Sequence, residues 1–222
     1  MAQRGSCRQQ QRRKDIQYGV MIAFPLCLCV RYLQRNRITM PSTENNSPTI
    51  WTVGHSTRPI EELLKLLHAA GIKLLADVRR FPGSRRHPQF NQDALAASLA
   101  KAAVKYRHFV DLGGRRTQRL PDSPNTAWRV ESFNAYADYM QSAEFLAALE
   151  DLMAAAQQQA TAIMCSEALP HKCHRRLIAD ALVARGWRVR HLLTPKRIDD
   201  HQLTPFARVE GTQIAYPANT LF

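Results

Sequence analysis

Residues 49–71 read TIWTVGHSTRPIEELLKLLHAAG, a strand pattern that is followed directly by a helix pattern. The first seven residues are mostly β-branched or aromatic, which favours an extended strand. Ser56 and Thr57 then offer a helix N-cap, and Pro59 fits the first helical turn. Leucines recur at helical spacing up to Gly71, where we expect the helix to end. The stretch predicts one strand–helix unit.

The same alternation continues along the chain. We expect strands at 72–78, 104–110, 160–167 and 187–193, and helices at 91–103, 131–140, 142–156 and from Cys173 to Gly186. Asn91 and Ser142 are the expected N-caps of two of these helices. Strands that alternate with helices form mostly parallel sheets with helices on both faces. The sequence therefore predicts a single α/β domain over residues 48–193, with 187–193 as its last strand.

Two flanking segments do not share this pattern. Residues 1–47 form a basic and partly apolar N-terminal extension. We expect it to lie outside the fold rather than to anchor the chain, because Pro25 interrupts its apolar run and Arg31 ends the run short of the roughly 20 residues that a membrane span needs. Residues 194–222 form a C-terminal tail without a readable pattern.

The formal net charge of +13 is unevenly distributed. Residues 1–40 hold eight of the 31 Lys and Arg residues, and the rest of the chain holds 23 basic and 17 acidic side chains, a net charge of +6. A mildly basic domain of this kind suits an anionic small molecule or a nucleic acid as partner but requires neither. We expect no membrane partner for the domain. Three of the five cysteines lie in the extension, so no paired secretory framework is visible, and we expect reduced thiols in a cytoplasmic protein. The oligomeric state does not follow from these features.

Polar side chains that can catalyse reactions or bind ligands follow three of the predicted strands. They are His55 and Ser56 after the first strand, Asp77 and Arg79 after the second, and Cys165 and Glu167 after the fourth. In open parallel sheets, ligands bind in the crevice outside the carboxyl ends of the strands. We therefore expect these side chains to converge on one crevice.

A second thiol stands in the stretch MCSEALPHKCHRRLIADAL, residues 164–182. Cys173 and His174 are expected to begin a helix, whose free N–H groups and dipole favour an anion or a thiolate. Cys173 is therefore a candidate nucleophile or redox thiol, and Cys165 a candidate partner. His55 or His174 would act as acid and base, and Asp77 or Glu167 would orient the histidine.

Arginines surround a Pro-Gly-Ser turn in DVRRFPGSRRHPQF, residues 77–90. Arginine forks suit phosphate or carboxylate, so Arg79 and Arg85 are candidate ligand-binding residues, as is Arg175. Ser56 and Ser84 add donors, and Gly113 and Gly114, in the long loop 111–130, allow the backbone to approach the same ligand. The chain contains neither a P-loop nor a dinucleotide fingerprint.

Two other functions remain open at this point. Cys165, Cys173, His174 and His171 are permitted ligands for a divalent metal such as zinc or iron, and His55 could complete the site from another strand, although the Cys-x7-Cys-His spacing lacks the short knuckle of structural zinc sites. The arginine-rich segment LGGRRTQRL, residues 112–120, suits a nucleic-acid-binding module without chemistry. Phe133, Tyr136 and Tyr139 recur at helical spacing, which is typical of core residues but also offers stacking surfaces.

Five motifs in this order resemble the domain-of-unknown-function family 488. They are TVGHST, ADVRRFPGSRRHPQF, YRHFVDLGGRR, FNAYADYM and MCSEALPHKCHRRLIADAL, and the resemblance runs from about residue 50 to 193. The candidate residues at the strand ends, the turn around Pro82 and Ser84, the glycine pair and the Cys/His/Arg cluster all match the pattern. The resemblance implies membership of that family and names no activity.

Overall fold

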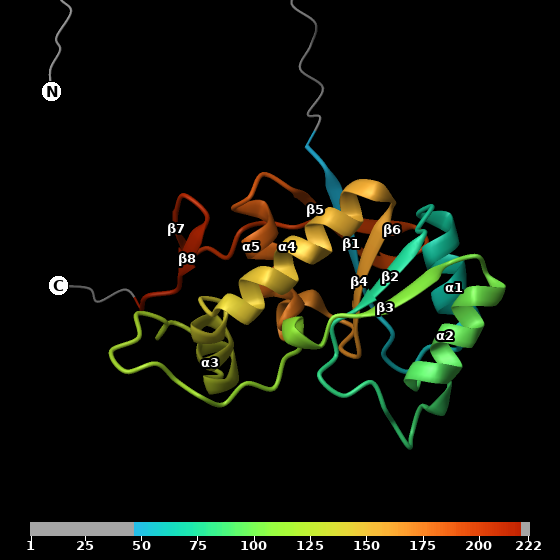
Figure 1. Cartoon of the computed structure of the whole chain (residues 1–222), viewed down its shortest axis with the longest axis horizontal. Helices are drawn as coiled ribbons and strands as arrows, with labels where there is room; N and C mark the ends of the chain where they lie inside the picture. Colours follow the sequence, from blue (N-terminus) through green and yellow to red (C-terminus); the bar gives the residue numbers. More distant parts are fainter. Residues whose placement is uncertain (1–46, 219–222) are drawn as a thin grey trace, which may run out of the picture. The chain divides into compact units, whose positions relative to one another are not determined.

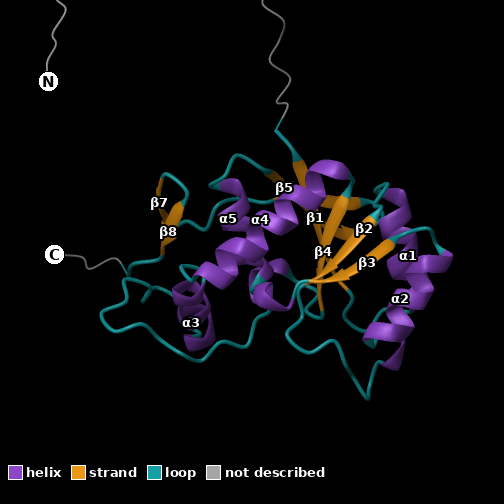
Figure 2. Cartoon of the chain, in the orientation of Figure 1, coloured by secondary structure: helices purple, strands orange, loops and turns teal. Residues whose placement is uncertain are grey.

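Five parallel strands and one antiparallel edge strand form the central sheet of the computed structural model, which describes residues 47–218. The strand order is β3-β2-β4-β1-β5-β6, and Figure 2 shows the strands side by side in orange. Their bounds are β1 Thr49–Gly54, β2 Leu74–Asp77, β3 Lys105–His108, β4 Thr161–Cys165, β5 Arg188–Thr194 and β6 Arg197–Asp200. Strands β1 to β5 pair in parallel, and β6 pairs antiparallel with β5. The predicted mostly parallel α/β sheet is confirmed, whereas the extension predicted over residues 1–47 lies outside the described residues except for its last residue.

Helices cover both faces of this sheet, as predicted (Figure 1). Their bounds are α1 Ile60–Ala69, α2 Gln92–Lys101, α3 Glu131–Tyr139, α4 Ala143–Gln158 and α5 Arg175–Val183. Leucines of α1 and α2 pack on one face in a cluster with Val53, and α3, α4 and α5 pack on the other with Ile50. Within residues 47–218, no helix has the length and apolar character that crossing a membrane requires.

The helix ends agree only in part with the N-caps and C-terminal glycines predicted from the sequence. Gly71 and Gly186 have φ values of +67° and +79°, the left-handed conformation that ends helices at glycine. Ser142 caps α4, since its Oγ accepts the N–H of Phe145 at 3.2 Å. Asn91 occupies the expected N-cap position of α2, but its side chain accepts the Ser84 N–H at 2.6 Å instead of an N–H of the helix. The expected cap of α1 is wrong, because Pro59 rather than Ser56 or Thr57 occupies its N-cap position.

Helix α5 begins two residues later than expected. Pro170 starts a short 3-10 turn, η3 (Pro170–Lys172), and the Cys173 N–H donates to the Pro170 carbonyl at 3.1 Å. Cys173 itself is extended, with φ −129° and ψ 145°, and His174 occupies the N-cap position. Cys173 therefore precedes the first helical turn rather than belonging to it.

The segment after residue 193 continues the fold. The expectation that 187–193 is the last strand is wrong, because β6 extends the sheet and β7 (Arg208–Glu210) pairs with β8 (Gln213–Ala215). Tyr216 is fully buried in the cluster that contains α5. Strand β6 reads RIDD and lies mostly exposed at the sheet edge, so it carries no apolar alternation that would have predicted it.

The connections that leave β1 and β4 run toward opposite edges of the sheet. From β1 the chain crosses through α1 to β2 on one side, and from β4 it crosses through α5 to β5 on the other side. These two strands are neighbours, paired from Trp51 with Ala162 to Gly54 with Cys165. Such a switch point opens a crevice beyond the carboxyl ends of the two strands, where ligands bind in α/β folds.

Candidate active site at the carboxyl edge of the sheet

A cavity of about 540 Å³ lies at this switch point. The structure brings nine of the predicted site residues together around it, namely His55, Ser56, Arg79, Ser84, Gly114, Cys165, Glu167, Cys173 and His174. It does not bring Asp77, Arg85, Gly113 or Arg175 to the cavity wall. The segments after β1, β2 and β4 and before α5 therefore meet here.

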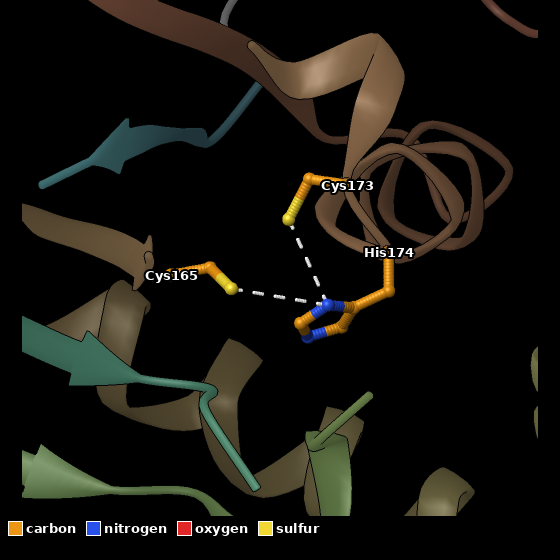
Figure 3. Close-up of side chains that lie close together, drawn as sticks. All are labelled: Cys165, Cys173 and His174. Carbon is orange, nitrogen blue, oxygen red and sulfur yellow. Dashed lines mark hydrogen bonds between the residues drawn. The ribbon is translucent and has the colours of Figure 1, made fainter. Parts of the chain in front are cut away.

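Two thiols and one imidazole form a tight cluster in this wall (Figure 3). The Sγ atoms of Cys173 and Cys165 lie 3.7 Å and 4.0 Å from the Nδ1 atom of His174. All three atoms lie within 4.8 Å of one another. Both cysteines are free thiols, exposed by only 7% for Cys165 and 3% for Cys173. The arrangement suits a thiol pair with an adjacent base, or three ligands of one metal ion.

A backbone carbonyl determines which nitrogen of His174 faces the sulfurs. The Nε2 atom lies 3.0 Å from the carbonyl oxygen of Val78, just beyond β2. A carbonyl only accepts hydrogen bonds, so Nε2 carries the proton. In the neutral ring, Nδ1 is then an acceptor that faces both thiols.

The two thiols differ in acidity. The neighbouring Cys165 thiol lowers the pKa of Cys173 to about 6, and the positive charge of Arg175 adds to this effect, while burial opposes it. The neighbouring Cys173 sulfur, together with burial, raises the pKa of Cys165 to about 12. Cys173 is therefore the thiolate of the pair near pH 7, while Cys165 keeps its proton.

Arg175 supports Cys173 from behind. Its Nε atom donates to the Cys173 sulfur at 3.3 Å, and its Nη2 atom donates to the carbonyl oxygens of Glu167 and Ala168. The side chain is only 1% exposed. Arg175 thus lies beneath the thiol, and the structure does not place it where the predicted contact with a bound anion requires it.

His55 also lines the cavity. Its ring stacks on Phe90 with a centroid distance of 4.1 Å, and its Nδ1–H donates to the Ser56 carbonyl at 2.9 Å. Nε2 then faces Arg79 Nη1 at 3.4 Å. Burial lowers the pKa of His55 to about 4, so the ring is neutral near pH 7. Ser56 has φ +49°, a strained conformation of the kind that collects at functional sites.

Neither carboxylate orients a histidine, contrary to expectation. Asp77 is fully buried and accepts from Arg79 Nε at 2.9 Å, from Arg79 Nη2 at 2.6 Å and from the Tyr106 hydroxyl at 2.8 Å. Glu167 lines the cavity, but its Oε1 accepts the Leu169 N–H at 3.2 Å. Asp77 therefore holds Arg79 in place, and Glu167 closes the turn after β4.

The mouth of the cavity carries three cations that the sequence analysis did not name as site residues, although Arg80 and Arg115 stand in its two arginine-rich segments. Arg80, Arg115 and Lys172 line it, and within residues 47–218 none of the three forms an ion pair. Arg115 has φ +59°. Lys172 directly precedes Cys173, so its place in the sequence could have predicted that it lies near the thiol. For Arg79 and Arg80, only the fold shows that Arg79 turns inward and that Arg80 lines the opening. The aromatic side chains of Phe81, Phe133 and Tyr136 also line the cavity.

The arginines of the 112–120 segment are partly engaged inside the protein. Arg119 pairs with Asp138 at 2.7 Å and with Glu131. Arg116 packs its guanidinium over the Tyr139 ring, 3.5 Å from the centroid. This leaves fewer free cations for a nucleic-acid backbone than the sequence alone indicates.

The comparisons with known proteins identify the family of the chain and no activity. Searches of curated proteins and of solved structures found no match. Residues 59–182, more than half of the 222-residue chain, match the family model described as domain of unknown function DUF488. The chain therefore belongs to the DUF488 family, as the resemblance of its five motifs implied.

Proposed function

We propose that this protein is an enzyme that uses the Cys173 thiolate as a nucleophile on a ligand bearing a phosphate or another anionic group. The observation that carries the proposal is the position of the Cys173 sulfur. It lies in the cavity wall between Arg175 Nε at 3.3 Å and His174 Nδ1 at 3.7 Å, and the mouth of the same cavity carries cations that form no ion pair with the described part of the chain. A nucleophile, a base and an anion-binding rim in one pocket are the parts that covalent catalysis requires.

Each residue then has a defined task. The Cys173 sulfur forms a bond to the electrophilic atom of the ligand, and the leaving group departs with the electron pair of the broken bond. His174 holds on Nδ1 the proton that Cys173 gave up in forming the thiolate, and passes it to the leaving group. Water then displaces the sulfur and returns its proton to His174, which restores the thiolate.

The rim favours a particular class of ligand. Arg80, Arg115 and Lys172 would hold the anionic group, and Ser84 would add a donor. Phe81, Phe133 and Tyr136 provide flat surfaces for a base, so a nucleotide or the end of a nucleic acid fits the proposal as well as a simple phosphate ester. The free thiols are consistent with a reducing, cytoplasmic setting.

Alkylation with iodoacetamide tests this proposal. Cys173 should be modified first in peptide maps of metal-free protein, and inorganic phosphate or adenosine monophosphate should slow the modification. Arg80→Gln and Arg115→Gln should abolish the protection, whereas Arg85→Gln should keep it, because Arg85 does not line the cavity. Absence of protection at millimolar ligand, or equal loss in all three variants, would refute the anionic ligand.

A metal centre is the second candidate, because the Cys165, Cys173 and His174 ligand atoms all lie within 4.8 Å of one another. Zinc or iron would leave one coordination position toward the cavity and would supply Lewis acidity there. The hydrogen bond from His174 Nε2 to Val78 is the support that metal-bound histidines use.

One substitution separates the two candidates. Cys165→Ser should abolish zinc binding by a metal centre, yet should leave Cys173 reactive if Cys173 is the nucleophile. His171→Ala serves as the control for zinc titration, because His171 is exposed and outside the cluster. Less than about a tenth of an equivalent of metal in protein purified without a His tag would exclude a resident metal.

A further inference from the structure

A line of hydrogen bonds leads from Cys173 into the protein interior. It begins at Arg175, whose Nε donates to the Cys173 sulfur and whose Nη1 donates to Thr52 Oγ1, both at 3.3 Å. Thr52 lies in β1 and is fully buried. Its Oγ1 atom lies 2.8 Å from Nδ1 of His191 in β5.

The line continues to a buried carboxylate in α5. His191 Nε2 lies 3.0 Å from His201 Nδ1, and His201 Nε2 lies 2.8 Å from Asp180 Oδ1. Asp180 is fully buried. Its carboxylate also accepts from the Thr204 backbone and hydroxyl at 3.0 Å and 2.7 Å, and from the Tyr216 hydroxyl at 2.9 Å. The C-terminal segment therefore surrounds the far end of the line.

With both histidines neutral, the chemistry of the two ends fixes the direction of every bond between them. The guanidinium of Arg175 only donates, and the carboxylate of Asp180 only accepts. Thr52 and a neutral histidine each hold one proton for this line. All bonds are satisfied only when Thr52 donates to His191, His191 donates to His201, and His201 donates to Asp180.

The environment keeps His191 in the neutral form that this arrangement needs. Burial lowers the pKa of His191 to about 4, and the nearby His201 and Arg175 act in the same direction. Its ring therefore carries a single proton near neutral pH.

We propose that Thr52, His191, His201 and Asp180 form a one-directional relay that positions the Arg175 guanidinium against Cys173. They are positioning residues, and the inference rests on the proposed role of Cys173. Thr52, His191 and His201 lie outside residues 59–182, so the relay ties segments beyond the family match to the thiol.

Substitutions at Thr52 test the relay at its link to Arg175. Thr52→Val keeps the shape and removes the hydroxyl, so we expect Cys173 of metal-free protein to react with iodoacetamide roughly fivefold more slowly, the factor that one modest hydrogen bond represents. Thr52→Ser retains the hydroxyl and should restore most of the rate. Thr161→Val is the matched control: Thr161 is equally buried in the neighbouring strand β4, but its Oγ1 bonds to Gln159. Its Cys173 rate should stay that of the wild type.

A double substitution tests whether the line acts as a unit. His201→Leu interrupts the relay two bonds further away and should slow Cys173 in the same direction. In the double variant Thr52→Val with His201→Leu, Cys173 should react no more slowly than in Thr52→Val alone. Either change already breaks the line of hydrogen bonds between Arg175 and Asp180. Additive slowing would refute the relay.

The outcome also separates this inference from the proposed function. A wild-type Cys173 that does not react in the folded protein contradicts the proposed function. A reactive wild-type Cys173 whose rate is the same in Thr52→Val, Thr52→Ser and Thr161→Val contradicts the relay alone. Circular dichroism melts of all variants identify any that fail to fold, and the isosteric Thr52→Val and Thr161→Val pair keeps the test decisive if His201→Leu does not fold.

Discussion

Gly114 lies so close to His174 that a Cβ atom at position 114 would come within 2.8 Å of the His174 Nδ1 atom. This is the nitrogen that faces the sulfurs of Cys165 and Cys173. Position 114, where the backbone passes the His174 imidazole, therefore requires a glycine. The two glycines that the sequence marks for close backbone approach therefore have different neighbours. Gly114 lies against the His174 ring, and Gly113 lies against the Arg80 backbone.

Gly114→Ala should displace the His174 ring and destabilise the protein by about 1–3 kcal/mol, because the added methyl group overpacks the site. Urea unfolding measures the loss, and the Cys173 alkylation rate should fall as well. Gly83→Ala provides the control, since Gly83 also lines the cavity and its Cβ would meet no atom within 4 Å. Equal stability of the two variants would contradict the contact.

Asp77→Asn should destabilise the fold by about 3–5 kcal/mol, because it leaves the buried Arg79 guanidinium without its carboxylate partner. Chemical denaturation measures this change. Asp200→Asn should cost less than about 1 kcal/mol, since Asp200 pairs with Arg188 and Arg190 at the exposed sheet edge. Similar costs for both substitutions would show that Arg79 does not depend on Asp77.

Stability should fall when the pH drops through the weakly acidic range. His55 and His191 have a folded pKa of about 4 against 6.5 in the unfolded chain, so unfolding takes up protons and acid favours the unfolded state. Between about pH 7 and about pH 5 each histidine should remove about 2 kcal/mol of stability. His55→Gln and His191→Gln should each weaken this pH dependence of the urea midpoint. A pH dependence that is unchanged in both variants would contradict the burial of neutral rings.

The sheet and the convergence of its strand ends were open to prediction from the sequence. Strands such as IKLLADV are apolar enough to be recognised, and the turn residues Gly71 and Gly186 mark helix ends by their conformational preference. The rule that parallel strands present their carboxyl ends at one edge then placed His55 near Cys165.

The partners of the polar residues were not open to prediction. Asp77 and Arg79 lie two positions apart, and only the bend after β2 makes them pair with each other instead of with a histidine. The relay escapes sequence reasoning for a related reason: His191 stands in a strand that reads as core, and His201 stands in a segment without apolar alternation. Tertiary packing determines both arrangements.

The most direct test of the account is the pH profile of iodoacetamide modification at Cys173, read by peptide mapping of metal-free, folded protein. The account predicts a rate that is half-maximal near pH 6 and level above it, while Cys165, with its pKa raised to about 12, stays unmodified at neutral pH. A Cys173 that stays unmodified in the folded protein, or whose rate rises only at the alkaline pH of an ordinary thiol, would contradict it.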